Sequence, residues 1–260
     1  MVAQRALEYN EINSDVILML DDDVTLQTDS VEKILTLMER ENLDALGPDV
    51  FENHKMSVKD KLFAVISNLI FPHFDQKWAI KIRLNGSFSY LLKPKKDWYP
   101  TQSFAGPAMA LRKDIIKKNH WEEELFLDSL EFAYGDDMLE SYKLFCNGYK
   151  LGMFFNSGVV HHDGKSASRN FKKGANLRTR SQAQYIIWHR CIFKPSGSKR
   201  RFLAAISFGL KLGWQTLGIS VLSVVKWNRS LIVEHMKGVK EAWQFIKSER
   251  YRSLSPYIIR

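Results

Sequence analysis

Three consecutive aspartates, Asp21, Asp22 and Asp23, directly follow an apolar run that begins at Val16. Two like charges about 4 Å apart repel by roughly 4 kcal/mol at an effective dielectric of 20, so the cluster needs open water or a cation. Alternating carboxylates such as Asp21 and Asp23 could share one face and bind Mg²⁺ or Mn²⁺, with substrate phosphates completing the coordination. The alternative is a solvated turn in which one aspartate caps the next helix.

A second acidic pair, Asp136-Asp137, precedes a helix that we predict over residues 138–147. Capping and the helix dipole favour carboxylates at this position and are the simpler explanation of the pair. The catalytic alternative is a general base, which would take the proton of an acceptor hydroxyl as that hydroxyl attacks an anomeric carbon. Such a reaction needs no covalent enzyme intermediate, so the configuration at the carbon would be inverted.

Two adjacent histidines, His161 and His162, end a further apolar stretch. A neutral imidazole can ligate a metal or hydrogen-bond a phosphate, although a histidine is more often a satisfied residue of the core or of a loop. Their position after an apolar strand makes them candidates for the same site as the aspartates.

Short apolar runs that alternate with helical patterns must position these groups. We expect strands over 16–20, 43–50, 106–111 and 151–160 and a hairpin about Asn85-Gly86. Helices are expected over 1–14, 59–70 and 139–147 and from Lys113. A further helix should carry Val31, Ile34, Leu35 and Met38 on one face. This pattern predicts an α/β fold with a mainly parallel sheet flanked by helices. Ligands gather at the carboxyl ends of the strands in such sheets, so the aspartates and histidines are expected to meet.

Three stretches, in this order, resemble family 2 glycosyltransferases of the GT-A fold, in particular bacterial members of the rhamnosyl- and galactosyltransferase kind. The first, VILMLDDDVTL, resembles the strand and DxD motif that binds the metal and the diphosphate of a nucleotide sugar. SFAGPAMALRKDII resembles the acceptor-side segment, and FAYGDDMLESYKLFCNGYKLGMFFNSGVVHHDGKS resembles the catalytic-base segment with its histidine motif. The resemblance covers residues 1–195, which we interpret as a partial catalytic domain.

The resemblance also implies roles for individual residues. Asp21 and Asp23 would hold the metal, with Asp23 the more direct ligand, and His161 or His162 would complete the metal or pyrophosphate site. Asp137 would be the catalytic base, with Asp136 beside it. Further binding residues are expected to be Asp22, Lys165 and Arg169 for the donor, and Gly106 and Trp98 for the acceptor. Glycine has no Cβ, which would let the acceptor approach the backbone closely.

The beginning of the chain departs from the family pattern. Residues 1–10 resemble the helix that normally follows the first nucleotide-binding strands. We therefore expect an N-terminally truncated sheet with an open edge, which an upstream segment or a partner would complete. The activity of the chain would depend on that completion.

The charge of the chain is concentrated in one segment. The net charge is +9, yet no acidic residue occurs between Asp163 and Glu234, where 14 lysines and arginines lie. Such a segment favours polyanions, which include anionic lipid, substrate phosphates and nucleic acid. Nucleic acid is disfavoured, because the basic segment runs into a long apolar stretch rather than interleaving aromatic residues on a polar face.

That apolar stretch spans residues 202–227 and carries a narrow polar stripe, made of Ser207, Lys211, Gln215, Gly218, Lys226 and Arg229. The pattern favours an interfacial helix on an anionic membrane surface; the alternatives are a helix docked on the catalytic domain and a membrane span. We expect residues 196–260 to form an amphipathic helical region at the cytoplasmic face of the cell membrane.

The predicted function is metal-dependent, inverting transfer of a sugar from a nucleotide-diphosphate donor to a lipid-linked or polysaccharide acceptor in cell-envelope glycan synthesis. The alternatives are a catalytically inactive, membrane-peripheral binding module and a nucleotidyltransferase, which uses similar carboxylates on a similar sheet. The two cysteines, Cys146 and Cys191, form neither a disulfide framework nor a metal-ligand spacing. No pattern in the sequence indicates the oligomeric state.

Overall fold

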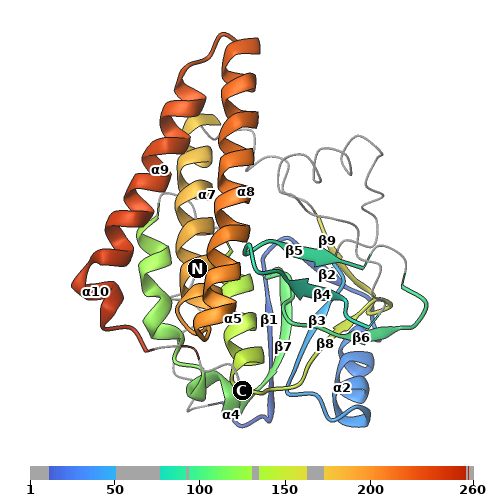
Figure 1. Cartoon of the computed structure of the whole chain (residues 1–260). Helices are drawn as coiled ribbons and strands as arrows, with labels where there is room; N and C mark the ends of the chain where they lie inside the picture. Colours follow the sequence, from blue (N-terminus) through green and yellow to red (C-terminus); the bar gives the residue numbers. More distant parts are fainter. Residues whose placement is uncertain are drawn as a thin grey trace.

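The computed structural model describes residues 12–50, 77–91, 94–130, 135–162, 173–255 and 257 of the chain. A layer of long helices stands beside a layer of strands (Figure 1), so the predicted α/β class is confirmed. The helices expected over 1–14 and 59–70 lie outside the described residues, as do the predicted donor-binding residues Lys165 and Arg169.

Five strands form the main sheet. In spatial order they are β1 (Val16–Leu20), β7 (Ala108–Arg112), β3 (Ala45–Pro48), β8 (Leu151–Phe154) and β6 (Trp98–Pro100). The prediction of a mainly parallel sheet is wrong, because only β3 and β8 are parallel neighbours and the other three pairs are antiparallel. Two of these pairs involve β7, which is inserted between β1 and β3 and runs opposite to both, and the third joins the edge strand β6 to β8. Strands β1, β3 and β8 still share one direction, so their carboxyl ends meet at one edge.

Two smaller sheets complete the strand layer: β2 (Val24–Leu26) pairs with β9 (Val159–His161), and β4 (Ile80–Ile82) pairs with β5 (Phe88–Tyr90). The β4–β5 pair is the predicted Asn85-Gly86 hairpin, with Gly86 at φ +71°. The single extended stretch expected over 151–160 is instead two strands, β8 and β9, in different sheets. Gly158 turns the chain between them at φ +72°, and a Cβ there would lie 2.7 Å from Ser30 Oγ, so a larger residue is excluded.

Helices occur as predicted near residue 30, from Lys113, near residue 139 and in the region 196–260, whereas the helical segments over 121–129, 173–188 and 189–193 were not predicted. They are α2 (Ser30–Arg40), α4 (Lys113–Lys118), the 3₁₀ segment η1 (Trp121–Ser129), α5 (Asp136–Cys146), α7 (Lys173–Trp188), the π-helical turn η2 (His189–Phe193), α8 (Ser198–Val225), α9 (Ser230–Lys247) and α10 (Glu249–Arg252). One predicted face is partly wrong. In α2, Ile34 and Met38 are buried as expected, but Val31 and Leu35 are each 43% exposed and Leu37 takes the inner position.

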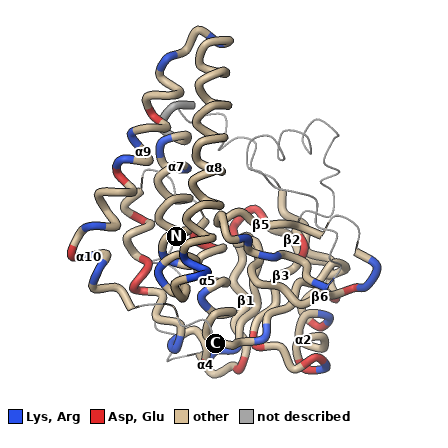
Figure 2. Tube along the Cα trace, viewed as in Figure 1, with Lys and Arg blue, Asp and Glu red and all other residues tan. Residues whose placement is uncertain are grey.

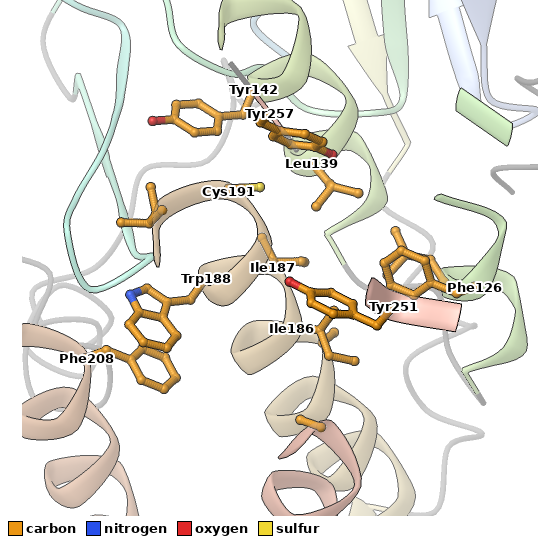
Figure 3. Close-up of a cluster of buried hydrophobic side chains, with 14 of the residues drawn as sticks. Phe126, Leu139, Tyr142, Ile186, Ile187, Trp188, Cys191, Phe208, Tyr251 and Tyr257 are labelled. Carbon is orange, nitrogen blue, oxygen red and sulfur yellow. The ribbon is translucent and has the colours of Figure 1, made fainter. Parts of the chain in front are cut away.

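One hydrophobic cluster joins the long helices to the rest of the molecule (Figure 3). The ring of Trp188, at the end of α7, stacks on Phe208 of α8 with ring centroids 4.0 Å apart, and its Nε1 donates to the carbonyl oxygen of Leu84 at 2.9 Å. Leu84 belongs to the turn of the β4–β5 hairpin, so this turn is anchored on α7 and α8. Residues before and after position 195 therefore share one core.

The polar stripe of α8 faces the protein over its first half. Lys211 is buried and its Nζ donates to the carbonyl oxygen of Asn85 at 3.3 Å, and burial lowers the pKa of Lys211 to about 8. Thr216 Oγ1 lies 3.0 Å from Nε2 of His235, which belongs to α9. Gly218, by contrast, is exposed. Of the three arrangements considered for this helix, which were an interfacial helix, a helix docked on the catalytic domain and a membrane span, the structure therefore shows α8 docked on the protein.

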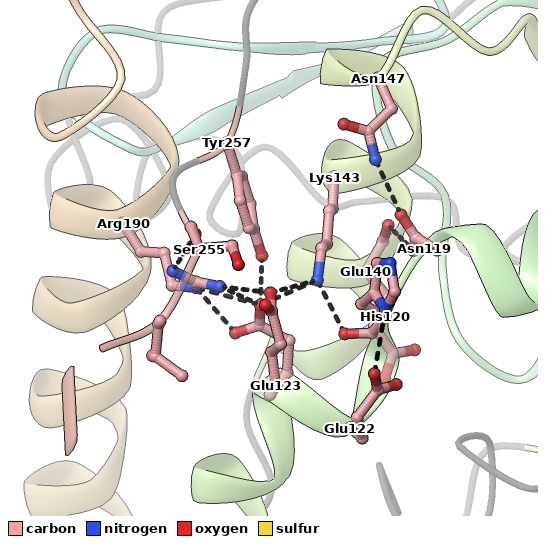
Figure 4. A network of polar contacts seen from close by, with 12 residues as sticks. Asn119, His120, Glu122, Glu123, Glu140, Lys143, Asn147, Arg190, Ser255 and Tyr257 are labelled. Carbon is pink, nitrogen blue, oxygen red and sulfur yellow. Dashed lines mark hydrogen bonds and ion pairs between the residues drawn. The ribbon is translucent and has the colours of Figure 1, made fainter. Parts of the chain in front are cut away.

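A buried charge network fixes η1, α5, η2 and the C-terminal segment to one another (Figure 4). The side chains of Glu124 and Arg190 are both 0% exposed, with Nη2 and Oε1 2.6 Å apart. Lys143 of α5 places its Nζ 3.4 Å from the same Oε1, and the hydroxyl of Tyr257 donates to that oxygen at 2.9 Å. Glu124 is the acceptor common to all three groups.

Glu124→Ala is expected to lower the free energy of unfolding by about 3–5 kcal/mol, because it leaves buried Arg190 without its main carboxylate. Glu122→Ala is the matched control: the Glu122 carboxylate is 60% exposed, and its removal should change stability by about 0.5 kcal/mol or less. Urea denaturation measures both. Equal effects of the two substitutions would contradict a structural role for the network.

Candidate active site

The aspartate run connects β1 to β2 and is tied to the beginning of β7. The backbone N–H of Asp21 donates to the carbonyl oxygen of Pro107 at 2.9 Å, one residue before β7 starts. This bond continues the antiparallel pairing in which Leu20 faces Ala108. The run therefore begins at the edge where the carboxyl ends of β1, β3 and β8 meet.

The pairing of β2 with β9 brings the aspartates to the histidines. Asp23 Oδ1 lies 3.2 Å from Nε2 of His161, and the two side chains are 36% and 19% exposed. His162 is oriented differently: its Nε2 lies 2.8 Å from Oγ1 of Thr25. His162 directly follows β9, and its backbone N–H continues the pairing by donating to the carbonyl oxygen of Asp23 at 2.8 Å, so the two imidazoles are expected to point to opposite faces. Of the two predicted metal-site histidines, the structure brings only His161 to an aspartate carboxylate.

The acidic pair stands at the first turn of α5. Gly135, at φ +74°, precedes the helix, and Asp136 is only 3% exposed whereas Asp137 is partly exposed. The two oxygens of Asp137 are each held by a backbone donor at 2.8 Å, Oδ2 by the N–H of Gly106 and Oδ1 by the N–H of Met138.

Residues 106 and 107 connect the three stretches. Gly106 contacts Asp137, Pro107 contacts Asp21, and Asp23 at the other end of the run contacts His161. The three stretches therefore approach the same edge of the sheet: Asp137 bonds to the backbone of Gly106, Asp21 bonds through its own backbone to Pro107, and side chains of two different stretches meet directly at Asp23 and His161.

Two other predicted site residues are placed less centrally. Asp22 is exposed in the turn between β1 and β2. Trp98 begins β6, four strand spacings or about 19 Å across the sheet from β1. Its half-buried ring packs against the cluster that contains Phe154 and Val159. This packing is sufficient to explain why the Trp98 ring is half-buried. Acceptor binding by Trp98 stays a prediction.

Sequence reasoning missed two groups at this edge. Asp49 directly follows β3 and is 7% exposed, and the hydroxyl of Tyr90 donates to its Oδ1. The sequence feature that could have identified Asp49 is its position just after a strand, which is the position that Asp21 holds after β1. Ser141, one turn beyond Asp137 in α5, has its Oγ 2.9 Å from Ser103 Oγ and so holds the segment that leads to Gly106.

The side chains at this edge provide only part of the ligands that a divalent cation needs. Among the residues that the structure describes, no group of three or more His, Cys, Asp or Glu side chains could hold a metal ion by itself. The Asp23–His161 pair supplies one hard oxygen and one imidazole nitrogen, both reachable from solvent. Mg²⁺ is often held by one or two carboxylates and completed by water and substrate phosphates, so a pair suffices when a diphosphate is bound.

Comparison with models of known protein families gives no match, and comparison with curated proteins gives none either.

The glycine before the acidic pair provides a test of how the site is built. Gly135→Ala and Gly148→Ala each place a Cβ at positive φ, at opposite ends of α5, and each should cost about 1–2 kcal/mol of stability. Gly135→Ala should cost more, because its Cβ would lie 2.9 Å from Ile187 Cδ1 whereas nothing lies within 4 Å of a Cβ at Gly148. Urea unfolding ranks the two, and the reverse order would refute this account of how α5 begins.

Proposed function

We propose that this chain carries the catalytic site of an inverting glycosyltransferase of the GT-A kind, which transfers a sugar from a nucleotide-diphosphate donor with the help of Mg²⁺ or Mn²⁺. The observation that carries the proposal is the link through residues 106–107, which puts Asp137 and the Asp23–His161 pair at one edge of the sheet. The motif order that resembles family 2 glycosyltransferases supports the same reaction.

Asp137 is the proposed general base. Its carboxylate takes the proton of the acceptor hydroxyl while that oxygen forms a bond to the anomeric carbon and the bond to the diphosphate breaks. Two backbone donors fix the orientation of the carboxylate, which is what a base needs to meet a hydroxyl at hydrogen-bond distance. A single displacement inverts the anomeric configuration.

Asp23 and His161 are the proposed protein contribution to a cation site, with Asp21 nearby. A divalent ion there would stabilise the charge that develops on the leaving diphosphate. The proposed acceptor is a lipid-linked glycan or a polysaccharide, which places the reaction in cell-envelope glycan synthesis at the cytoplasmic face of the membrane.

A second candidate function is a membrane-peripheral binding module without catalysis. The exposed apolar surface of α8 favours this candidate, because such a surface can bind a membrane whether or not the protein has an active site. This candidate predicts vesicle binding without affinity for nucleotide sugars.

Asp137→Asn is expected to reduce sugar transfer by about 10²–10⁴-fold, because the amide cannot accept the proton. Donor binding, measured by calorimetry with uridine or guanosine diphosphate sugars and Mn²⁺, should stay unchanged. Asp114→Asn, which alters a 60% exposed carboxylate on α4, is the matched control. Urea unfolding checks that the Asp137 variant is folded, since its amide also loses one backbone contact. Full activity in a folded Asp137→Asn variant would show that the base is another residue.

Asp23→Asn and His161→Ala are each expected to weaken Mn²⁺-dependent donor binding by about tenfold or more, because each removes one of only two proposed ligands. His162→Ala is the control for His161→Ala, since its imidazole contacts Thr25 instead. Chelation of the metal should abolish the binding heat of the unaltered chain. Donor binding that is indifferent to both metal and Asp23 would leave the cation site without support.

A further inference from the structure

The polarity of α8 is the reverse of what a helix on the surface of a soluble protein normally has. Seven large apolar residues recur at spacings of three and four along it and are between 43% and 74% exposed: Leu203, Ile206, Leu210, Trp214, Leu217, Val221 and Val224. We call them the outer face of α8. The spacing places them on one side of the helix, and the helix of 28 residues is about 42 Å long. A continuous exposed apolar strip of this length indicates an apolar environment.

The inner face of α8 is fixed by polar contacts with the protein. Lys211 bonds to the hairpin turn, Gln215 Nε2 lies 3.4 Å from Gln184 Oε1 of α7, and Thr216 meets His235 of α9. His235 also bonds to Ser181 of α7 through its Nδ1, at 2.8 Å. These contacts set the rotation of α8, so the outer face cannot turn inward without leaving buried polar groups unpaired.

By length and composition, α8 is the one helix in the described part of the chain that could cross a membrane, and 17% of its most apolar window is buried. A span would either separate Lys211 and Thr216 from their partners or carry the charged helices α7 and α9, which pack on α8, into the lipid. An orientation in the plane of the membrane keeps these contacts and still covers the outer face. The far ends of α8 and α9 extend beyond the strand layer (Figure 1).

Basic residues stand at both ends of α8 (Figure 2). Lys199, Arg200 and Arg201 precede the outer face, and Lys226 and Arg229 follow it, with no acidic residue between 173 and 233. Two copies packed along α8 would bring basic ends together whether the helices ran parallel or antiparallel. Anionic headgroups, in contrast, match both ends at once. Trp227, next to the last turn and 96% exposed, is of the residue type that favours the headgroup level.

We propose that α8 lies in the plane of an anionic bilayer, with its outer face inserted between the lipids and its basic ends at the headgroups. The protein is thereby bound to one leaflet by a helix whose other side holds α7 and α9. This inference rests on the surface of α8 and not on the proposed reaction, so either can fail without the other.

Flotation of the full chain with vesicles tests the binding. Vesicles of phosphatidylcholine with phosphatidylglycerol should carry the protein, and pure phosphatidylcholine vesicles should carry distinctly less. Replacing Leu210 and Leu217 together by Glu should weaken binding about tenfold or more, because carboxylates would enter the apolar layer. Leu35→Glu, at a 43% exposed position of α2, is the matched control and should bind normally. Equal flotation of the double variant, no flotation of the unaltered chain, or a dimer in sedimentation that the double variant abolishes would each overturn the proposal.

Depth measurements test the orientation. A fluorophore on Ile206→Cys, Leu217→Cys or Val224→Cys should be quenched by brominated lipids at similar, shallow depths along the whole helix. The natural cysteines, Cys146 and Cys191, are buried, which restricts labelling to the introduced thiol. A label on Val31→Cys of α2 should escape quenching. A depth that increases toward the middle of α8 and decreases again would show a span and refute the in-plane arrangement.

Discussion

Two main-chain hydrogen bonds at residues 106 and 107 hold the candidate site together. The N–H of Gly106 donates to Asp137, and the carbonyl oxygen of Pro107 accepts from Asp21. Both residues immediately precede β7, which lies between β1 and β3 and runs antiparallel to both. In the mainly parallel sheet that we expected, the beginning of a neighbouring strand would lie at the opposite edge from the end of β1. The antiparallel strand is therefore what brings the acceptor-side segment to the aspartates.

The same helix that carries Asp137 also connects the site to the helical layer. Asp137 lies in the first turn of α5, and Lys143 lies further along it, in contact with the Glu124 carboxylate that also holds Arg190 of η2. Trp188, just before η2, stacks on Phe208 of α8. Continuous packing thus runs from the candidate base to the helix that we propose lies in the bilayer. This packing would set the distance between the candidate site and the membrane, and therefore the distance at which a lipid-linked acceptor would reach the site.

The sequence predicted the elements better than their arrangement. The aspartate run after β1, the hairpin at Asn85-Gly86 and the helix after Asp137 depend on local signals, and all are present. The direction of β7 and the break between β8 and β9 depend on pairing between distant residues, which the periodicity of the sequence does not contain. Likewise, the sequence showed the polar stripe that contains Lys211, but it did not show which face of the helix packs on the protein, because the amphipathic spacing is the same in both cases. At the candidate site, Asp23 and His161 were singled out because they follow or end apolar strands, whereas Asp49 lay inside the strand expected over 43–50 and was overlooked.

The two carboxylates of the acidic pair have different environments, and this difference separates their roles. The N-cap of α5 is Gly135, with no side-chain cap hydrogen bond, so the pair does not cap the helix; the helix dipole is what favours Asp136, whose side chain is buried in the first turn. The dipole explains Asp137 less well. One of its oxygens is turned away from the helix, toward the N–H of Gly106, thirty-one residues earlier in the chain. The dipole alone needs no such long-range partner, whereas a base must be held at a fixed angle to the bound acceptor. The bond to Gly106 supplies that constraint from the segment that the family resemblance assigns to the acceptor.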